Sequence, residues 1–324
     1  MVGVTVRIIS KSVNLPDIEY RNFFHSKDFF NIVKLSPEQT PYMAVAERDG
    51  VCIAHLLATV RRRGSLLPPY LYSQGRVFGE GEYKNENEKA ELFELLLKAI
   101  TKKLRRRLCL YIEFSDISQK MFGYKAFRHN HYFPVSWQEI HNSLHSKTPE
   151  ERLTAKQLKR VSRIYQLGLE TREVANSKEL SQLYRLFRGY YRTRLHRFLP
   201  SEQHFHQLYQ SPHAKCFVTT YKDNIIGGAV CVYSDGNAYL WHFASKKKRY
   251  PRLHPNFMTV WNTLKYAHSH NYAHLFFMDA GLPFKRNLVR EFTLSFGGKP
   301  VAKYRWFRCS IPWINSFLAW IYKE

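Results

Sequence analysis

The first half of the chain alternates between short apolar runs and turn residues, a pattern typical of a β-meander. Asp49–Gly50 separates the first two runs and is a strong signal for a tight hairpin. After a polar, acidic loop, apolar residues recur at helical spacing over 88–104, and a continuous apolar run (LCLYIEF) follows, as in a strand buried on both faces. The predicted strands are 41–48, 51–60, 70–78 and 108–114.

The second half repeats this order about 170 residues further along the chain, with Asp223–Asn224 at the turn and a helix over 257–270. Its predicted strands are 216–221, 225–233, 238–244 and 274–279. The offset far exceeds the period of a solenoid, so we expect two α/β domains of one architecture in tandem. In each, antiparallel strands precede a strand–helix–strand crossover, whose strands must be parallel.

We assign the N-terminal domain to residues 1–148 and the C-terminal domain to 149–324. The two domains should superpose, each a mixed sheet flanked by helices, with a join near 140–155 and a ligand cleft between them. The remaining predicted elements are a short helix at 139–145, a basic helix at 153–167 that ends at Gly168, helices at 179–191 and 201–209, and a last strand at 303–308.

The tail 311–322 (IPWINSFLAWIY) predicts a terminal helix that packs on the body of the protein. Residues 309–324 would then pack back on the first domain. The alternative is a peripheral contact with a membrane surface through 311–322. No apolar run reaches the roughly 18 residues that a membrane-spanning helix needs.

The formal net charge is +24, which favours an anionic partner over a cationic or neutral one. Possible partners are tRNA, a nucleotide-bearing substrate and an anionic membrane surface. The other explanation is a generically basic protein. A hydrophobic content of 44% excludes a disordered chain.

Five cysteines include no C-x-x-C pair, and four lie in apolar runs, so we expect reduced, buried thiols. Together with an N-terminus too short and polar for a signal peptide, this predicts a cytoplasmic location. The histidines fit no ligand spacing, and no metal site is predicted.

Three stretches resemble one known family. They are 153–173 (LTAKQLKRVSRIYQLGLETRE), 244–281 (ASKKKRYPRLHPNFMTVWNTLKYAHSHNYAHLFFMDAG) and 289–306 (VREFTLSFGGKPVAKYRW). In order and spacing they are similar to the basic helix, the strand–loop–helix–strand core and the Phe–Gly–Gly segment of FemAB-like proteins. This is a tandem branch of the GNAT (Gcn5-related N-acetyltransferase) superfamily that includes peptidoglycan aminoacyltransferases. The likeness covers 140–308 well and 20–135 only as architecture.

The resemblance implies an acyltransferase that moves an acyl or aminoacyl group to an amine and forms an amide. The co-substrate would be acyl-CoA or aminoacyl-tRNA, with no tightly bound cofactor. The loop 249–256 lacks the glycines that hold the pyrophosphate of CoA, which favours tRNA. Pro200, His204 and Phe205 stand where the muramyl-peptide enzymes carry an arginine and an aromatic pair, which argues against that acceptor. The acceptor stays open between a small amine-bearing molecule and a cell-envelope precursor.

The loop that follows the strand 238–244 is rich in lysine and arginine and leads into a helix. A helix N-terminus attracts phosphate through unpaired N–H donors and its dipole, and arginine adds bidentate contacts. The alternative is a solvated charged loop. In GNAT-like proteins the preceding strand splays and exposes its backbone to the acyl donor. The candidate donor-binding residues are Tyr239, Arg249, Arg252, His254, Asn256 and Phe257.

Three residues are candidates for proton transfer. His242 could act as a base or orient the nucleophile, although an ordinary core histidine would show the same pattern. Asp279 ends a buried strand, where it could accept the proton of an attacking amine or simply cap a turn. Tyr304 could protonate a leaving group, or belong to an aromatic core.

These observations together predict an acyltransferase whose second domain holds the donor and whose first domain mainly shapes the acceptor site. The rival from another class is a non-catalytic, degenerate GNAT pair that binds nucleic acid or an anionic glycan.

Overall fold

The computed structural model describes residues 3–64, 70–192, 198–277, 282 and 287–322. The chain divides into two compact units, one formed by Met1–Trp137 and Ala302–Glu324, the other by Gln138–Val301. The division differs from the expected boundary at 148/149. The reason is that strands β7 (Phe133–Ser143) and β13 (Lys299–Cys309) each contribute residues to both units.

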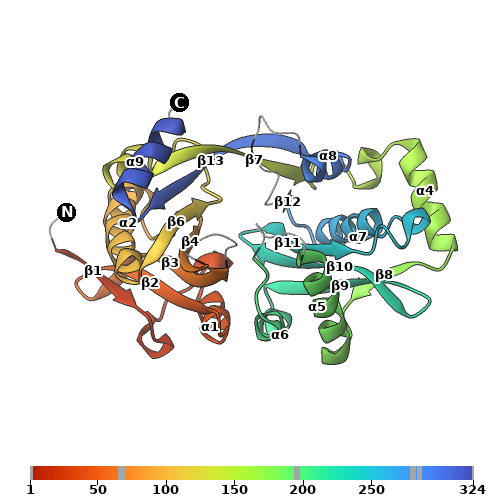
Figure 1. The fold of residues 1–324 in the computed structure, drawn as a ribbon, viewed down its shortest axis with the longest axis horizontal. Coiled ribbons are helices and arrows are strands. Elements are labelled where there is room, and N and C mark those ends of the chain that lie inside the picture. The colour runs from red at the N-terminus through yellow and green to blue at the C-terminus, as the bar shows by residue number, and fades with distance from the viewer. Residues whose placement is uncertain (1–2, 65–69, 193–197, 278–281, 283–286, 323–324) are drawn as a thin grey trace. The chain divides into compact units, whose positions relative to one another are not determined.

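Unit 1 is an antiparallel meander followed by a parallel crossover (Figure 1). Strand β4 pairs in parallel with β6, and helix α2 connects them while burying Leu92, Leu96 and Ile100 at helical spacing. The other elements are short 3-10 turns (η) and helices. In chain order unit 1 contains β1 (Val4–Ile9), η1 (Ser12–Asn14), η2 (Phe23–His25), α1 (Lys27–Lys34), β2 (Gln39–Arg48), β3 (Val51–Gly64), β4 (Leu71–Phe78), β5 (Glu82–Tyr83), η3 (Glu86–Glu88), α2 (Lys89–Arg106), β6 (Cys109–Ser115), α3 (Tyr124–His129) and α9 (Pro312–Ile321).

Unit 2 repeats the same order: β9, β10 and β11 form the antiparallel meander, and α7 connects β11 to the parallel strand β12. The prediction of two tandem α/β units, each with mixed strands flanked by helices, is therefore confirmed. In chain order unit 2 contains η4 (Glu150–Arg152), α4 (Ala155–Gln166), β8 (Glu170–Glu173), α5 (Ser177–Tyr191), α6 (Glu202–Gln210), β9 (Ala214–Tyr221), β10 (Asn224–Ser234), β11 (Asn237–Ser245), η5 (Pro251–Leu253), α7 (Pro255–Ser269), β12 (His274–Phe277) and α8 (Leu288–Leu294).

Two expectations need correction. The strands do not form a separate sheet in each domain, because their pairing follows one path, β1-β2-β3-β4-β6-β13-β7-β12-β11-β10-β9-β8. The predicted short helix at 139–145 is also wrong, since most of that segment belongs to strand β7. Residues 140–143 pair antiparallel with β12, so a partner more than 130 residues away overrides the local helical pattern.

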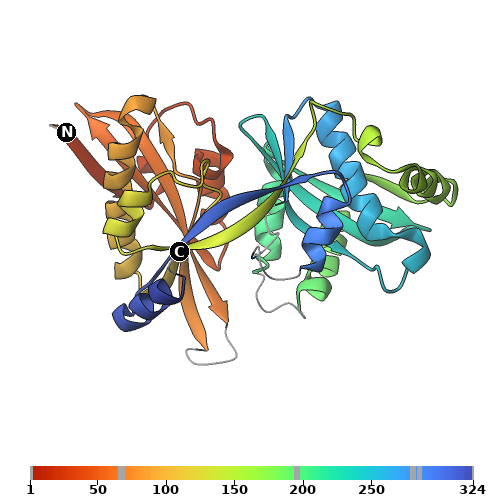
Figure 2. The same cartoon turned by 90° about the horizontal axis from the view of Figure 1, so that it is seen from above.

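Helices α5 and α7 cover opposite faces of the sheet in unit 2, and Gly227–Gly228 in β10 lies between them. A Cβ on Gly227 would meet Thr259 of α7, whereas one on Gly228 would lie 2.2 Å from the Leu183 side chain of α5 and 2.8 Å from the Phe217 carbonyl oxygen. These glycines therefore let both helices approach the backbone of the strand closely. Figure 2 shows the fold from above.

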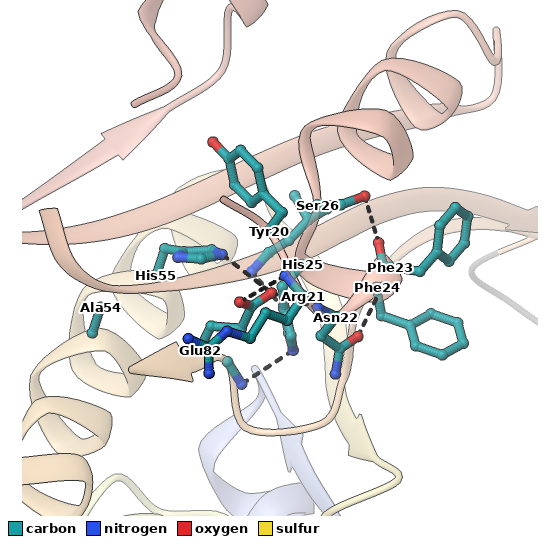
Figure 3. Close-up of polar contacts among 12 residues, drawn as sticks. Tyr20, Arg21, Asn22, Phe23, Phe24, His25, Ser26, Ala54, His55 and Glu82 are labelled. Atoms are coloured by element: carbon teal, nitrogen blue, oxygen red, sulfur yellow. Dashed lines mark hydrogen bonds and ion pairs between the residues drawn. The ribbon is translucent and has the colours of Figure 1, made fainter. Parts of the chain in front are cut away.

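A buried histidine fixes the loop between β4 and α2 in unit 1 (Figure 3). The Leu57 N–H donates to His25 Nδ1 at 3.0 Å, and the Gly81 N–H approaches Nε2 at 3.1 Å. Burial, and next the neighbouring His55, lowers the pKa of His25 to about 3. The imidazole is therefore neutral in the folded protein.

Glu82 on the same loop ties it to the segment before η2. Its carboxylate accepts the N–H groups of Arg21 at 3.1 Å and Asn22 at 2.8 Å, and His55 Nε2 lies 3.7 Å away. Burial alone would raise the pKa of Glu82, but these partners outweigh it and lower the pKa. The acidic loop of unit 1 thus rests on a buried polar framework.

We expect Gly228→Ala to destabilise the protein by about 1–3 kcal/mol, because the new methyl overlaps a packed side chain and a backbone oxygen. The matched control is Gly189→Ala in α5, where nothing lies within 4 Å of the added Cβ and the better helix propensity should stabilise by up to about 1 kcal/mol. Urea unfolding measures both. Equal effects of the two substitutions would contradict the packing argument.

His25 should make folding stability depend on pH. A histidine in the unfolded chain has a pKa near 6.5, whereas the pKa of His25 in the folded protein is about 3. Between these two pH values the unfolded chain binds a proton at this position and the folded chain does not. Stability from this group is thus present above pH 6.5 and lost as the pH falls. The stability gap between the wild type and His25→Gln should narrow by about 1.4 kcal/mol per pH unit below 6.5. A gap for His25→Gln that stays constant below pH 6.5 would refute the assignment.

Candidate functional site

The loop between the third meander strand and the crossover helix occupies the same topological position in both units but carries opposite charge. In unit 1 the loop contains Glu80, Glu82, Glu86 and Glu88, and Glu91 lies in the first turn of α2. In unit 2 the loop 246–254 is basic, and the first turn of α7 contains no acidic residue. Because a helix N-terminus is the positive end of its dipole, unit 2 attracts phosphate there and unit 1 repels it.

The basic loop folds over a buried anchor and leaves its charges exposed. Leu253 of η5 is buried, and Lys246 donates to the Ile225 carbonyl at 2.8 Å. His254, which precedes α7, has a left-handed backbone with φ 43°. The exposed cations of the loop are Lys247, Lys248, Arg249 and Arg252.

Two groups of this loop have lowered pKa values, first because of burial and then because of neighbouring cations. Burial, followed by Arg249, lowers the pKa of Lys246. Burial, followed by Arg160 and Lys247, lowers the pKa of His254. Arg160 belongs to helix α4, so the positive field of the loop extends onto that helix, which also carries the exposed Lys156, Lys159 and Arg163.

The N-terminus of α7 offers few backbone donors. Pro255 has no N–H, and the N–H groups of Phe257 and Met258 both donate to the His254 carbonyl, at 2.9 and 3.1 Å. The buried Asn256 Oδ1 has no hydrogen-bond partner among the described residues. Arginine and lysine side chains, more than backbone N–H groups, are thus what this loop presents to an anion.

The strand before the loop, β11, is irregular in its pairing. The pairing of β11 with β10 skips Trp241, which forms a bulge, and the parallel pairing with β12 covers only Ala238–Leu240 among the residues that the structure describes. Beyond Leu240, the described residues of β11 pair with β10 alone. This is the position at which GNAT-like proteins expose strand backbone to an acyl donor.

The predicted site residues separate into groups. Arg249, Arg252, His254 and Asn256 come together at the loop, whereas Phe257 packs against Phe296 in the core of unit 2 at a ring distance of 4.6 Å. Tyr239 is also nearly buried, with its ring edge-on to Phe276. Neither of these two rings is exposed to a donor at the loop.

The two candidates for proton transfer that the structure describes, His242 and Tyr304, belong to different units. His242 is buried against Phe187 of α5 and Phe205 of α6, on the face of the sheet opposite α7. Tyr304 belongs to unit 1, in whose core it packs edge-on to Trp306. Asp279 lies outside the described residues. The described part of the chain contains no group of three potential metal ligands.

Unit 1 also contains a buried charged network on its own strands, which sequence reasoning missed. Glu113 accepts from Gln74 Nε2 at 2.7 Å and lies 3.3 Å from the Arg305 guanidinium. Arg61 donates to Gln74 Oε1 at 2.9 Å, and burial, followed by the neighbouring arginines, lowers its pKa to about 9. Residues from four strands meet in it, so only the folded sheet reveals it.

Comparisons with known proteins agree with this architecture. Residues 152–286 match the family described as acetyltransferase (GNAT) domain. No curated protein matches the sequence. The structure is similar to FemX at 11% identity and a TM-score of 0.64, covering 92% of this chain and 94% of that one.

Two further structures show the same arrangement. A tandem GNAT protein from the clavulanic acid biosynthesis pathway has 8% identity and a TM-score of 0.55, with 94% of this chain and 99% of that chain covered. The C-terminal domain of a putative lysylphosphatidylglycerol synthetase from Agrobacterium fabrum has 13% identity and a TM-score of 0.54, with 91% and 92% covered. Residues 152–286 thus match a GNAT acetyltransferase domain, and the chain shares the fold of FemX and of the tandem GNAT protein.

Proposed function

We propose that the protein transfers an aminoacyl group from aminoacyl-tRNA to an amine, with the donor held by unit 2. The observation that carries this proposal is the contrast between equivalent loops: acidic in unit 1 and basic in unit 2, each at a helix N-terminus. A phosphate-bearing donor is favoured at the second position and disfavoured at the first.

The distribution of charge supports tRNA over a small nucleotide. Arg160 of α4 interacts electrostatically with His254 of the loop, and α4 carries the further exposed cations Lys156, Lys159 and Arg163. Such a surface suits many phosphates, whereas CoA presents only a few. The scarcity of free N–H groups at the start of α7 also argues against a backbone cradle for the pyrophosphate of CoA.

Acyl-CoA is the second candidate, because residues 152–286 match the acetyltransferase (GNAT) domain family. In either case the amine nitrogen attacks the acyl carbon and forms the new C–N bond. The bond to the ester oxygen of tRNA, or to the thioester sulfur of CoA, then breaks, and the amine loses a proton.

We propose Asp279 as an acceptor for that proton. Backbone N–H groups of β11 beyond Leu240 would stabilise the negative oxygen of the tetrahedral intermediate. Unit 1 would shape the acceptor site. We propose an amine-bearing molecule of the cell envelope as the acceptor. The likeness to the lysylphosphatidylglycerol synthetase supports the cell envelope but not the amine, because phosphatidylglycerol offers a hydroxyl.

Removing the two arginines of the loop should weaken donor binding. For Arg249→Ala and Arg252→Ala we expect a loss of about 1.5–3 kcal/mol each, typical of hydrogen bonds to charged groups, or about 10- to 150-fold in Kd. Equilibrium binding of aminoacylated tRNA and of acetyl-CoA measures the effect. The control is Lys178→Ala on α5, an exposed cation on the opposite face from α7. If the two arginine variants keep the wild-type affinity for both ligands, or if Lys178→Ala loses as much affinity as they do, the loop is not the donor-binding site.

The salt dependence of binding should identify the donor. Each phosphate contacted contributes about −0.7 to −0.9 to the slope of log K against log salt, so tRNA held by several cations gives a steep slope and acyl-CoA a shallow one. We expect the affinity for tRNA to fall steeply with salt concentration, and we expect an amide to form when an amine is added. Thioester turnover without tRNA affinity would select the CoA donor. Steep tRNA binding without transfer to any amine tested would instead support a non-catalytic binding protein.

A further inference from the structure

Helix α9 presents an aromatic stripe to solvent. Trp313, Phe317, Trp320 and Ile321 are 72%, 54%, 70% and 49% exposed, and their spacing places them along one face of the helix. The helix has no charged residue, and none of its residues is buried. Scattered exposed apolar residues need no explanation, but a contiguous stripe of this kind marks an interaction surface.

The opposite side of α9 holds it firmly on unit 1, so the exposed stripe has a fixed direction. Asn315 Oδ1 accepts the Cys309 N–H at 2.8 Å, and Asn315 Nδ2 donates to the His131 carbonyl at 3.0 Å. The Tyr322 ring stacks on Phe133 with centroids 6.0 Å apart. The helix therefore contacts unit 1 through its less aromatic side.

Cations and further exposed apolar groups adjoin the start of this helix. Ser310, two residues before α9, bonds to the Cys109 carbonyl and lines a shallow pocket. The last turn of α2 lines the same pocket with Lys102, Arg105 and Arg106, together with Leu108. None of the residues that line it is acidic.

Leu108 adds to the exposed apolar surface in an unusual way. It is 86% exposed and adopts a left-handed backbone with φ 54° just after α2, where glycine is the usual residue. Both features disfavour leucine in an isolated protein. Leu71, which also lines the pocket, is 64% exposed.

An aromatic and aliphatic stripe beside a cluster of cations fits the interface of an anionic bilayer. Tryptophan favours the headgroup level, the apolar side chains enter the acyl boundary, and each nearby cation attracts anionic lipid. A second copy fits less well, because a twofold contact through the same surface would bring two cation clusters together. No helix among the described residues is long and apolar enough to cross a membrane.

We propose that α9, with Lys102, Arg105, Arg106 and Leu108, docks the protein on an anionic lipid surface. The contact is peripheral, with α9 lying along the interface. It is independent of the donor and of the transfer reaction.

The test is sedimentation of the full chain with vesicles of phosphatidylcholine alone and of phosphatidylcholine mixed equally with phosphatidylglycerol, without donor or acceptor. We expect binding to the mixed vesicles, weak binding to the neutral ones, and a blue shift of tryptophan fluorescence. The double variant Trp313→Ser/Trp320→Ser should bind about tenfold or more weakly. The double variant Arg105→Gln/Arg106→Gln should lose about fivefold for each cation and show less salt dependence.

The matched controls are Leu288→Ser, an exposed apolar residue of unit 2, and Lys178→Gln, an exposed cation of α5. All the substituted positions are exposed, and circular dichroism checks that each variant folds. Equal binding to neutral and anionic vesicles, or full binding by the tryptophan variant, would overturn the proposal. So would a dimer that the tryptophan substitutions abolish in a protein that binds no vesicles. Because no donor is present, these outcomes leave the proposed transfer reaction untouched.

Discussion

Both units depend on one constraint of backbone geometry. A crossover between parallel strands must carry a helix back across the sheet, and this sets a helix N-terminus beside the end of the third meander strand. The dipole at that point attracts an anion in either unit. The charges of the side chains in the preceding loop then strengthen or cancel that attraction. Four glutamates occupy the position in unit 1, and five lysines and arginines occupy it in unit 2.

The acidic loop of unit 1 uses its carboxylates for structure. Glu82 satisfies two backbone N–H groups, and Glu80 bonds to the Ser118 N–H at 3.0 Å. Gly81 has φ 96°, and a Cβ there would lie 2.5 Å from the His55 carbonyl oxygen. The carboxylates of the unit 1 loop are thus engaged in hydrogen bonds within unit 1, whereas most cations of the unit 2 loop are exposed to solvent. One backbone plan thus serves packing in one unit and ligand attraction in the other.

Patterns confined to one element were predictable from the sequence. The hairpins at Asp49–Gly50 and Asp223–Asn224 join β2 to β3 and β9 to β10, and the basic loop precedes a helix. Features that depend on pairing between residues distant in the sequence were not predictable in this way. The segment 139–145 became a strand because β12 pairs with it, and the charged network around Glu113 joins residues from separate strands. The sequence placed Arg160 in a basic helix, but only the folded structure shows its electrostatic interaction with His254.

The net charge of +24 has more than one physical meaning in this molecule. The cations on the loop and on α4 are mostly exposed, so their attraction for a ligand is mainly Coulombic and salt screens it. The cations at the end of α2 adjoin an aromatic helix, where burial of apolar surface adds a contribution that salt does not screen. Arg61, in contrast, is buried and hydrogen-bonded within unit 1. A partner of the first surface must therefore be highly charged. A partner of the second must offer both anionic groups and a hydrocarbon phase, and a lipid surface provides both.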